Sequence, residues 1–378
     1  MRKSIAIIIT SILVLSGCNK QQSVSDRLLN EVEKAIAINP DSASNLLKGI
    51  SSPEKLDNKT FARWCMLSGK ITDEIFNSIL PTYQLERAYD WYSSHGSPDE
   101  QVQILIYLGR SYFADGDYDK AMSIYTNALD IAEKNKLNNL TGYTYSYIGD
   151  LYGEKFMRTE AIKRYKAAAE CFKKENNTDS YACALRDVGR EYACIDSLSR
   201  ALKILTIADS VARNTKNIEV TASIDNALGN IYAMQNKYDK AEEYFLKALV
   251  GRETMPDYMA LIDLYIASGA INKAQELLSK ILQDNPKYTY SIKYLYYQIY
   301  NEEKNYKEAL TNLKEYVEIT DSIIYADNQS KILNIESKYN HLKISKEVDR
   351  LKIKQQSYII VLVICIGILL LIIIGYLL

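Results

Sequence analysis

The stretch LGRSYFADGDYDKAMSIYTNA, residues 108–128, carries the pattern that organises the chain. An aliphatic residue and a glycine precede Tyr112, and Ala121, Tyr125 and Ala128 then follow at helical spacing. The pattern returns at intervals of 40 residues, with its small residue at Gly149, Gly189 and Gly229. Four copies in a fixed phase predict four pairs of helices.

The spacing of these residues has a physical cause. A glycine lets two antiparallel helices approach closely, and an Ala–aromatic–Ala stripe at i, i+4 and i+7 packs against the first helix and the next hairpin. Neither helix can bury its apolar face alone, so the hairpins must stack. These residues resemble the tetratricopeptide repeat (TPR) family in a long-repeat form. The resemblance implies an all-α solenoid, a right-handed superhelix of helix hairpins.

Composition agrees with a helical chain and excludes one class of partner. The 378 residues include 46 basic and 47 acidic side chains, so the net charge of -1 gives no field that attracts nucleic acid. Only 15 glycines and 6 prolines are present, which indicates helices joined by short loops.

The repeats extend beyond the four clear copies. Residues 25–97 read as degenerate N-terminal hairpins, because terminal repeats of solenoids are usually atypical. We expect four helices there, over 25–39, from Pro40 with Asp41 or Ser42 as its cap, over 58–73 and over 82–94. Residues 98–320 form about six repeats, comprising four 40-residue units near 102–135, 142–175, 182–215 and 222–252 and two shorter ones. The six residues beyond a 34-residue repeat are expected to lengthen the second helices or the loops.

The start of the chain resembles a bacterial lipoprotein signal. Residues 1–17 have a basic start and a short apolar core, and they end in small residues directly before Cys18. The resemblance implies cleavage before Cys18 and lipidation of its thiol, with 18–24 as a polar tether. The alternative is an ordinary signal peptide or an uncleaved anchor with a chance cysteine.

The end of the chain predicts a long helix and a membrane span. Residues 321–356 hold no glycine or proline, and their 3-4 apolar spacing suits either a coiled-coil homodimer or a cap on the last repeat. Residues 357–378 are uncharged and long enough to cross a bilayer. Five basic residues precede this span (Lys343, Lys346, Arg350, Lys352 and Lys354), which by the positive-inside rule alone would place them in the cytoplasm. The N-terminal signal argues for export, and we follow it.

The cysteines and histidines do not predict a chemical site. Cys65, Cys171, Cys183 and Cys194 lie on expected helices and read as packing residues, with a Cys171–Cys183 bridge as the alternative in an oxidising compartment. The two histidines lie apart, and the common catalytic and nucleotide-binding motifs are missing from the sequence. We therefore expect neither an enzyme nor a bound metal or cofactor.

The phase of the repeat places one set of side chains on the inner face of the first helices. They are Tyr107, Arg110, Tyr147, Asp150, Arg186, Arg190, Asn226, Asn230 and Asp263. Guanidinium groups hold carboxylates, and asparagine amides bond in both directions to an extended backbone. These residues, above all the Arg and Asn pairs at i and i+4, are candidate peptide contacts. The alternative is an ordinary solvated helix face.

Two functions follow from this organisation. The first is a scaffold, or the receptor half of a sensor, that binds proteins or peptides in its concave groove. The second is a transmembrane signal transducer whose cytoplasmic output region is missing or supplied by a partner. The chain resembles membrane-anchored bacterial TPR lipoproteins, and this implies the inner membrane with the repeats facing the periplasm.

Overall fold

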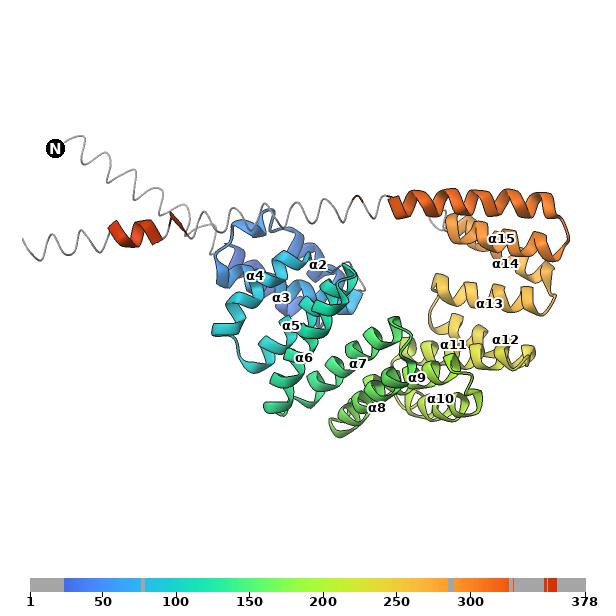
Figure 1. Ribbon diagram of the computed structural model, residues 1–378, viewed down its shortest axis with the longest axis horizontal. Coiled ribbons are helices and arrows are strands. Elements are labelled where there is room, and N and C mark those ends of the chain that lie inside the picture. The colour runs from blue at the N-terminus through green and yellow to red at the C-terminus, as the bar shows by residue number, and fades with distance from the viewer. Residues whose placement is uncertain are drawn as a thin grey trace, which may run out of the picture. The chain divides into compact units, whose positions relative to one another are not determined.

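In the computed structural model, the described residues are 24–75, 79–284, 289–325, 329, 350, 351 and 353–358. Every regular element among them is a helix (Figure 1). The chain divides into two compact units, Met1–Tyr316 and Val317–Leu378, and the four 40-residue repeats lie in the first. The all-α repeat architecture predicted from the sequence is confirmed.

The helices follow one another as hairpins. The N-terminal part holds a helix over 24–36, α2 (Pro40–Lys48), the short η1 (Pro53–Lys55), α3 (Asn58–Ile75) and α4 (Thr82–His95). The 40-residue repeats are α5 (Pro98–Ala114) with α6 (Tyr118–Lys134), α7 (Asn138–Glu154) with α8 (Arg158–Lys174), α9 (Thr178–Cys194) with α10 (Leu198–Ala212), and α11 (Ile218–Met234) with α12 (Tyr238–Gly251). Next come α13 (Met255–Ala267), α14 (Ile271–Asp284), α15 (Thr289–Glu302) and a helix over 306–325.

The extra length of the repeat is shared between both helices of a hairpin. α5, α6, α7, α8 and α9 each have 17 residues, and three-residue turns join them. The expectation that the second helices or the loops alone would take the added residues is wrong, because the first helices are lengthened as well. Longer first helices give the inner face of the solenoid more surface.

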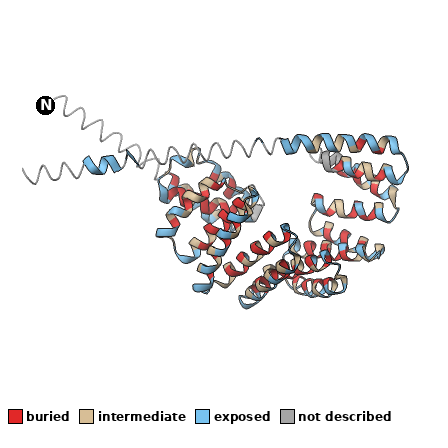
Figure 2. Cartoon of the chain, in the orientation of Figure 1, coloured by how far each residue is buried: buried red, intermediate tan, exposed pale blue. Residues whose placement is uncertain are grey.

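The hairpins are held together by the contact that the sequence pattern predicts. A Cβ added to Gly109 would lie 2.3 Å from the ring of Tyr125, and the same holds at 2.6–2.7 Å for the three later repeats, in which Gly149 meets Tyr165, Gly189 meets Leu205 and Gly229 meets Phe245. These partners are buried, as are the alanines that flank them, and Figure 2 shows buried residues along the helix faces that meet. The second helix of each repeat therefore fits against the first only where the first has no side chain.

The N-terminal part follows the predicted helices closely, with one difference. α2 is capped by Asn39, whose side-chain oxygen accepts a hydrogen bond from the amide of Ser42 at 2.9 Å. The cap expected at Asp41 or Ser42 is therefore wrong by two or three positions. Pro40 occupies the first turn of the helix, where a missing N–H costs nothing.

Several sequence-based predictions fall outside the described residues. They concern the signal peptide and Cys18, nearly all of the span 357–378, and most of the long helix 321–356. Among the residues that are described, no helix is long and apolar enough to cross a bilayer. The predictions for the two ends of the chain stay predictions.

The four described cysteines are free thiols, and a Cys171–Cys183 bridge is not formed. Cys65 is fully buried, and burial raises the pKa of its thiol. Cys194 is exposed, so the expectation that all four pack in the core does not hold for it.

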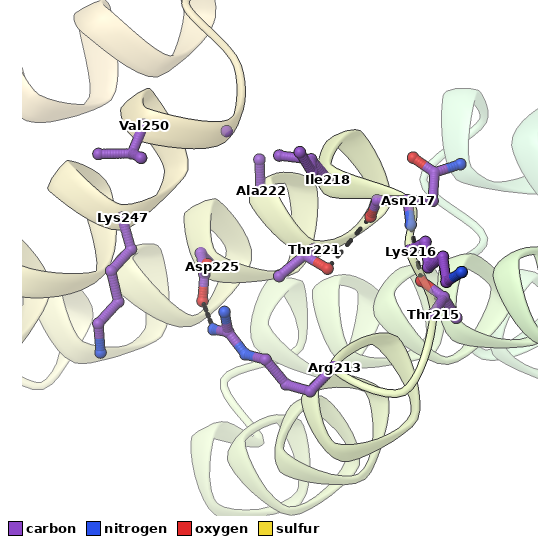
Figure 3. Close-up of a pocket in the computed structure, with 11 residues that line it drawn as sticks. Arg213, Thr215, Lys216, Asn217, Ile218, Thr221, Ala222, Asp225, Lys247 and Val250 are labelled. Carbon is purple, nitrogen blue, oxygen red and sulfur yellow. Dashed lines mark hydrogen bonds and ion pairs between the residues drawn. The ribbon is translucent and has the colours of Figure 1, made fainter.

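One repeat carries a carboxylate where the others are apolar or aromatic. Asp225 on α11 is only 2% exposed, and it occupies the repeat position of Leu105, Tyr145 and Leu185. Arg213 donates to its Oδ1 at 2.5 Å, at one side of an open cavity of about 470 Å³ (Figure 3). Burial raises the pKa of Asp225 to about 6, although Arg213 and Lys247 favour the charged form.

A glycine substitution tests the packing contact. Gly149→Ala should lower the free energy of unfolding by about 1–3 kcal/mol, because its Cβ would lie 2.7 Å from the Tyr165 ring. Gly153→Ala, one turn later on α7, meets nothing closer than 3.4 Å and should instead raise it by up to about 1 kcal/mol. Thermal unfolding followed by circular dichroism measures both. Equal shifts in the two variants would contradict this account of the interface.

A second substitution tests the buried carboxylate. Asp225→Leu should raise the free energy of unfolding at pH 7.5 by about 1–3 kcal/mol, since a desolvated carboxylate is replaced by an apolar side chain while Arg213, whose side chain is 45% exposed, stays solvated. Arg213 keeps Asp209, to which it donates at 2.9 Å. The folded-state pKa of Asp225 lies above its ordinary value of 3.8, so the folded wild type binds this proton more tightly than the unfolded chain does. The stability that the bound proton contributes is lost as pH rises through about 6.

The gain in melting temperature from Asp225→Leu should consequently be larger at pH 7.5 than at pH 4.5. Comparing the variant with the wild type at each pH removes the effect of the other titrating groups. A variant that is less stable than the wild type at pH 7.5, or a gain that does not change with pH, would show that the ion pair stabilises the fold.

Candidate peptide-binding groove

Two adjoining cavities lie along the first helices of the central repeats. The first, of about 500 Å³, is lined mainly from α7, α8 and α9, with Phe113 added from α5, and we call it the α7–α9 cavity. The second, of about 470 Å³, is lined from α9, α11 and α13, and we call it the α9–α11 cavity. Arg186 and Arg190 line both, so the two cavities form one groove that crosses α9.

The α9–α11 cavity brings together the four residues of the predicted Arg and Asn pairs, Arg186, Arg190, Asn226 and Asn230. Each pair is separated by four residues on its helix, which places both side chains on the same face. The cavity is therefore the feature of the structure that agrees best with the predicted site.

Arg186 is held firmly by its neighbours. Its Nε donates to Oδ1 of Asp187 at 3.0 Å, and one terminal nitrogen donates to Oδ2 of the same carboxylate at 3.1 Å. The other terminal nitrogen donates to Oγ of Ser223 on α11 at 3.0 Å. Arg186 thus joins α9 to α11, and most of its hydrogen-bonding capacity is already used inside the protein.

Asn226 is held in the same manner from the next repeat. Its Nδ2 donates to Oδ1 of Asp257 at 2.8 Å, and Asp257 is completely buried. Arg252 donates to both oxygens of Asp257 at 2.9 and 3.0 Å, and the hydroxyl of Thr254 also donates to it. The pairing and the hydrogen bonds compensate for the burial of this carboxylate, which fixes the amide of Asn226.

Arg190 and Asn230 lie outside this inner layer. The side chain of Arg190 is 65% exposed, and its terminal nitrogen is 3.7 Å from Oδ1 of Asp187. Asn230 is exposed, and its Nδ2 donates to Oδ1 of Asn226 at 2.9 Å. Asp187, the partner of Arg186, thus lies beside Arg190, and Asn226 positions Asn230, while both outer residues remain exposed.

Asp150 contributes a carboxylate to the α7–α9 cavity. It accepts a hydrogen bond from the hydroxyl of Tyr165 at 2.7 Å. Although water reaches the carboxylate, protein surrounds it on most sides, and this desolvation raises its pKa to about 6. The hydrogen bond from Tyr165 opposes that shift, while the charge of Asp187 adds to it.

Tyr107, Arg110 and Tyr147 form a separate cluster and contribute to neither cavity. Tyr107 donates to Asp73 at 3.0 Å, and Arg110 pairs with the same carboxylate. The Arg110 guanidinium lies 5.6 Å from the ring centroid of Tyr147, which stacks on Tyr125 at 5.6 Å. These contacts join α3, α5, α6 and α7, so the cluster serves to connect the repeats.

Asp263 is placed on the exposed face of α13 and lines neither cavity. Desolvation of the carboxyl group by the surrounding protein raises the pKa of Asp263. The predicted inner-face set is therefore divided into the groove residues Asp150, Arg186, Arg190, Asn226 and Asn230, the cluster around Arg110, and the isolated Asp263.

The partners that hold the groove were not singled out from the sequence. Asp187, Ser223 and Asp257 are ordinary polar residues on amphipathic helices, and their roles depend on which helix faces them. Only Asp187 gives a local signal, since it is adjacent to Arg186 in the chain. Within the described part of the chain, no group of three His, Cys, Asp or Glu side chains is arranged to hold a metal ion.

Comparison with known proteins supports the fold. Residues 100–174 and 221–255 match family models for the tetratricopeptide repeat. A comparison with curated proteins gives no significant match. No enzyme family is indicated.

Two solved structures resemble the chain over most of its length. A Rap protein complexed with competence and sporulation factor is 18% identical, with a TM-score of 0.61 over 81% of this chain and 88% of that one. The apo form of RapI is 14% identical, with a TM-score of 0.53 over 84% of this chain and 96% of that one. At these identities the likeness concerns the fold. The chain is therefore an all-α repeat protein that carries tetratricopeptide repeats.

Proposed function

We propose that this chain is a protein-interaction module that binds an extended peptide segment in the groove crossing α9. The observation that carries the proposal is the two-layer arrangement in the α9–α11 cavity. Arg186 and Asn226 are fixed from within the protein, and the exposed residues lie against this layer: Arg190 is beside Asp187, the partner of Arg186, and Asn230 donates to Asn226. Such preorganisation reduces the entropy lost when a ligand binds.

The chemistry of the outer pair indicates the kind of ligand. The Nδ2 of Asn230 donates to the backbone and side-chain oxygens of Asn226 at 3.0 and 2.9 Å, so its Oδ1 is the atom offered to an N–H group of an extended backbone. Arg190 has only a long contact with Asp187, at 3.7 Å, so its guanidinium has donors left for a carboxylate. The proposed ligand is an extended peptide with an acidic side chain at the position that reaches Arg190.

The comparisons support the binding of a protein or peptide partner by this kind of fold. The Rap structure with the higher similarity contains a bound competence and sporulation factor, so a solenoid of this shape accommodates a partner in at least one related fold. Tetratricopeptide repeats also match the sequence at the two hairpins before α9, formed by α5 to α8, and at the α11–α12 hairpin after its repeat.

We also propose a location for the module. The lipoprotein-like signal over 1–17, with Cys18 directly after it, and the apolar segment 357–378 together support an inner-membrane protein with its repeats in the periplasm, and we propose that Cys18 carries the lipid. Two attachments hold a protein far more firmly than a single acyl chain. The long segment 321–356 is the proposed site of homodimerisation.

Selection from a library of displayed octapeptides tests the groove. The full chain in mild detergent should enrich peptides with an acidic residue, and a fluorescent copy of the best peptide then gives the dissociation constant. Arg190→Ala combined with Asn230→Ala should weaken binding about tenfold or more, because charge-assisted and amide hydrogen bonds are lost.

The matched control is Arg200→Ala combined with Asn214→Ala, which removes the same two residue types from exposed positions outside the groove. The control should bind as the wild type does. Both double variants should melt within a few degrees of the wild type, since all four residues are exposed. Equal affinities for the groove variant and the wild type would refute the proposed site.

The location has its own test. Cys18→Ser should abolish incorporation of an alkyne-labelled fatty acid into the chain in bacterial cells, because the thiol that accepts the lipid is gone. Cys65→Ser is the control, and it should be labelled as the wild type is. Labelling that persists in Cys18→Ser would mean that the cysteine is not the anchor.

A further inference from the structure

The turn between the two helices of each 40-residue repeat contains one residue with a positive φ. It is Gly116 in the first repeat, with φ 77°, and Asp196 and Asn236 in the third and fourth, each with φ 57°. In the second repeat the residue is Phe156, with φ 58°. Glycine, asparagine and aspartate tolerate this region, whereas a bulky aromatic residue there is a marked exception.

The fold itself gives no reason for a phenylalanine at this turn. The backbone amide of Phe156 donates to the carbonyl of Gly153 at 2.9 Å, and Asn236 makes the equivalent bond to Ala233 at 2.8 Å. The turn is thus formed by the backbone whatever the side chain is. The Phe156 residue is 80% exposed, so its ring adds little to the apolar core.

The ring lies instead at the edge of the groove. Phe156 lines the α7–α9 cavity together with Phe113, and Arg190 lines the same cavity. Phe113 is held in place by an edge-to-face contact with Tyr118, with ring centroids 5.4 Å apart. Two aromatic rings from different repeats therefore border one cavity beside the exposed guanidinium of Arg190.

A charged side chain also fixes the position of the Phe156 ring. The guanidinium of Arg158 lies 5.0 Å from its centroid, and Arg158 donates to Glu191 on α9 at 3.2 and 3.3 Å. The ring is thus placed by a cation–π contact that is itself fixed to the next repeat. An aromatic side chain that is strained, exposed and positioned in this way fits a binding role better than a structural one.

We propose that Phe156 and Phe113 form an apolar subsite that takes a Leu, Ile, Met or Phe side chain of the bound peptide. The proposal rests on the proposed function and specifies its ligand: an extended peptide in which this apolar residue lies a short, fixed distance from the acidic residue at Arg190. Aromatic anchors at the edge of a polar groove supply contact area with little loss of conformational entropy, and the neighbouring charges set the register.

The same octapeptide selection tests this subsite. Peptides selected by the wild type should share an apolar residue at a constant spacing from the acidic one. Phe156→Asn gives the second repeat the residue that the fourth repeat has, and it should weaken binding of the best selected peptide about tenfold or more. Asp196→Asn changes the equivalent turn of the third repeat and should leave affinity unchanged.

Two peptides, the selected one and its apolar-to-alanine variant, are each measured against the wild type and Phe156→Asn. These four affinities separate a direct contact between the ring and the apolar residue from an indirect effect of the substitution. Replacing the apolar peptide residue by alanine should weaken binding to the wild type about tenfold and have almost no effect on binding to Phe156→Asn. The melting temperature of Phe156→Asn should equal or exceed that of the wild type, because asparagine suits the left-handed turn. A structural role for the ring would instead lower the melting temperature.

The outcomes distinguish this inference from the proposed function. If the selected peptides share the acidic residue but no apolar position, or if Phe156→Asn binds them with unchanged affinity, the subsite is refuted and the groove stands. If no peptide is enriched, both proposals fail. If sedimentation shows a dimer of the free chain that Phe156→Asn dissociates, a second copy covers the ring and the subsite is refuted.

Discussion

The close contact between a glycine on one helix and a large side chain on the next is the constraint on which the rest of this structure depends. Gly109, Gly149, Gly189 and Gly229 leave room that Tyr125, Tyr165, Leu205 and Phe245 fill completely. The contact fixes the distance and the rotation of the two helices in each hairpin. Because it recurs every 40 residues, it also sets which face of each first helix points into the groove.

The groove uses the freedom that this regular packing leaves. Side chains on the inner face take no part in the glycine contact, so successive repeats can place an aspartate, an arginine or an asparagine there. The half-buried Asp187 and the buried Asp257 then restrain the inner residues, and the outer residues Arg190 and Asn230 remain exposed. The glycine contact and the groove thus depend on different residues.

Two residues depart from the repeat at positions where the others agree. Asp225 introduces a buried charge where Leu105 and Leu185 are apolar, and Phe156 introduces an aromatic ring where a glycine, an aspartate and an asparagine accept a positive φ. Both departures oppose local stability. Phe156 lines the proposed groove, where the proposed contact with a ligand accounts for its presence. Asp225 lines a different cavity, and the role that the structure assigns to it is its pairing with Arg213.

The sequence by itself determined the helix pairs, their boundaries to within a few residues and the packing of glycine against large side chains, because helical periodicity and close approach leave a local pattern that can be counted. It also placed Arg186, Arg190, Asn226 and Asn230 on one face. Only the tertiary structure decided that the hydrogen-bonding groups of Arg186 and Asn226 are taken up by other side chains of the protein. It also decided that Arg110 belongs to another cluster and that Phe156 borders the groove. Those outcomes depend on side chains from different helices, and the spacing along one helix carries no record of what faces it.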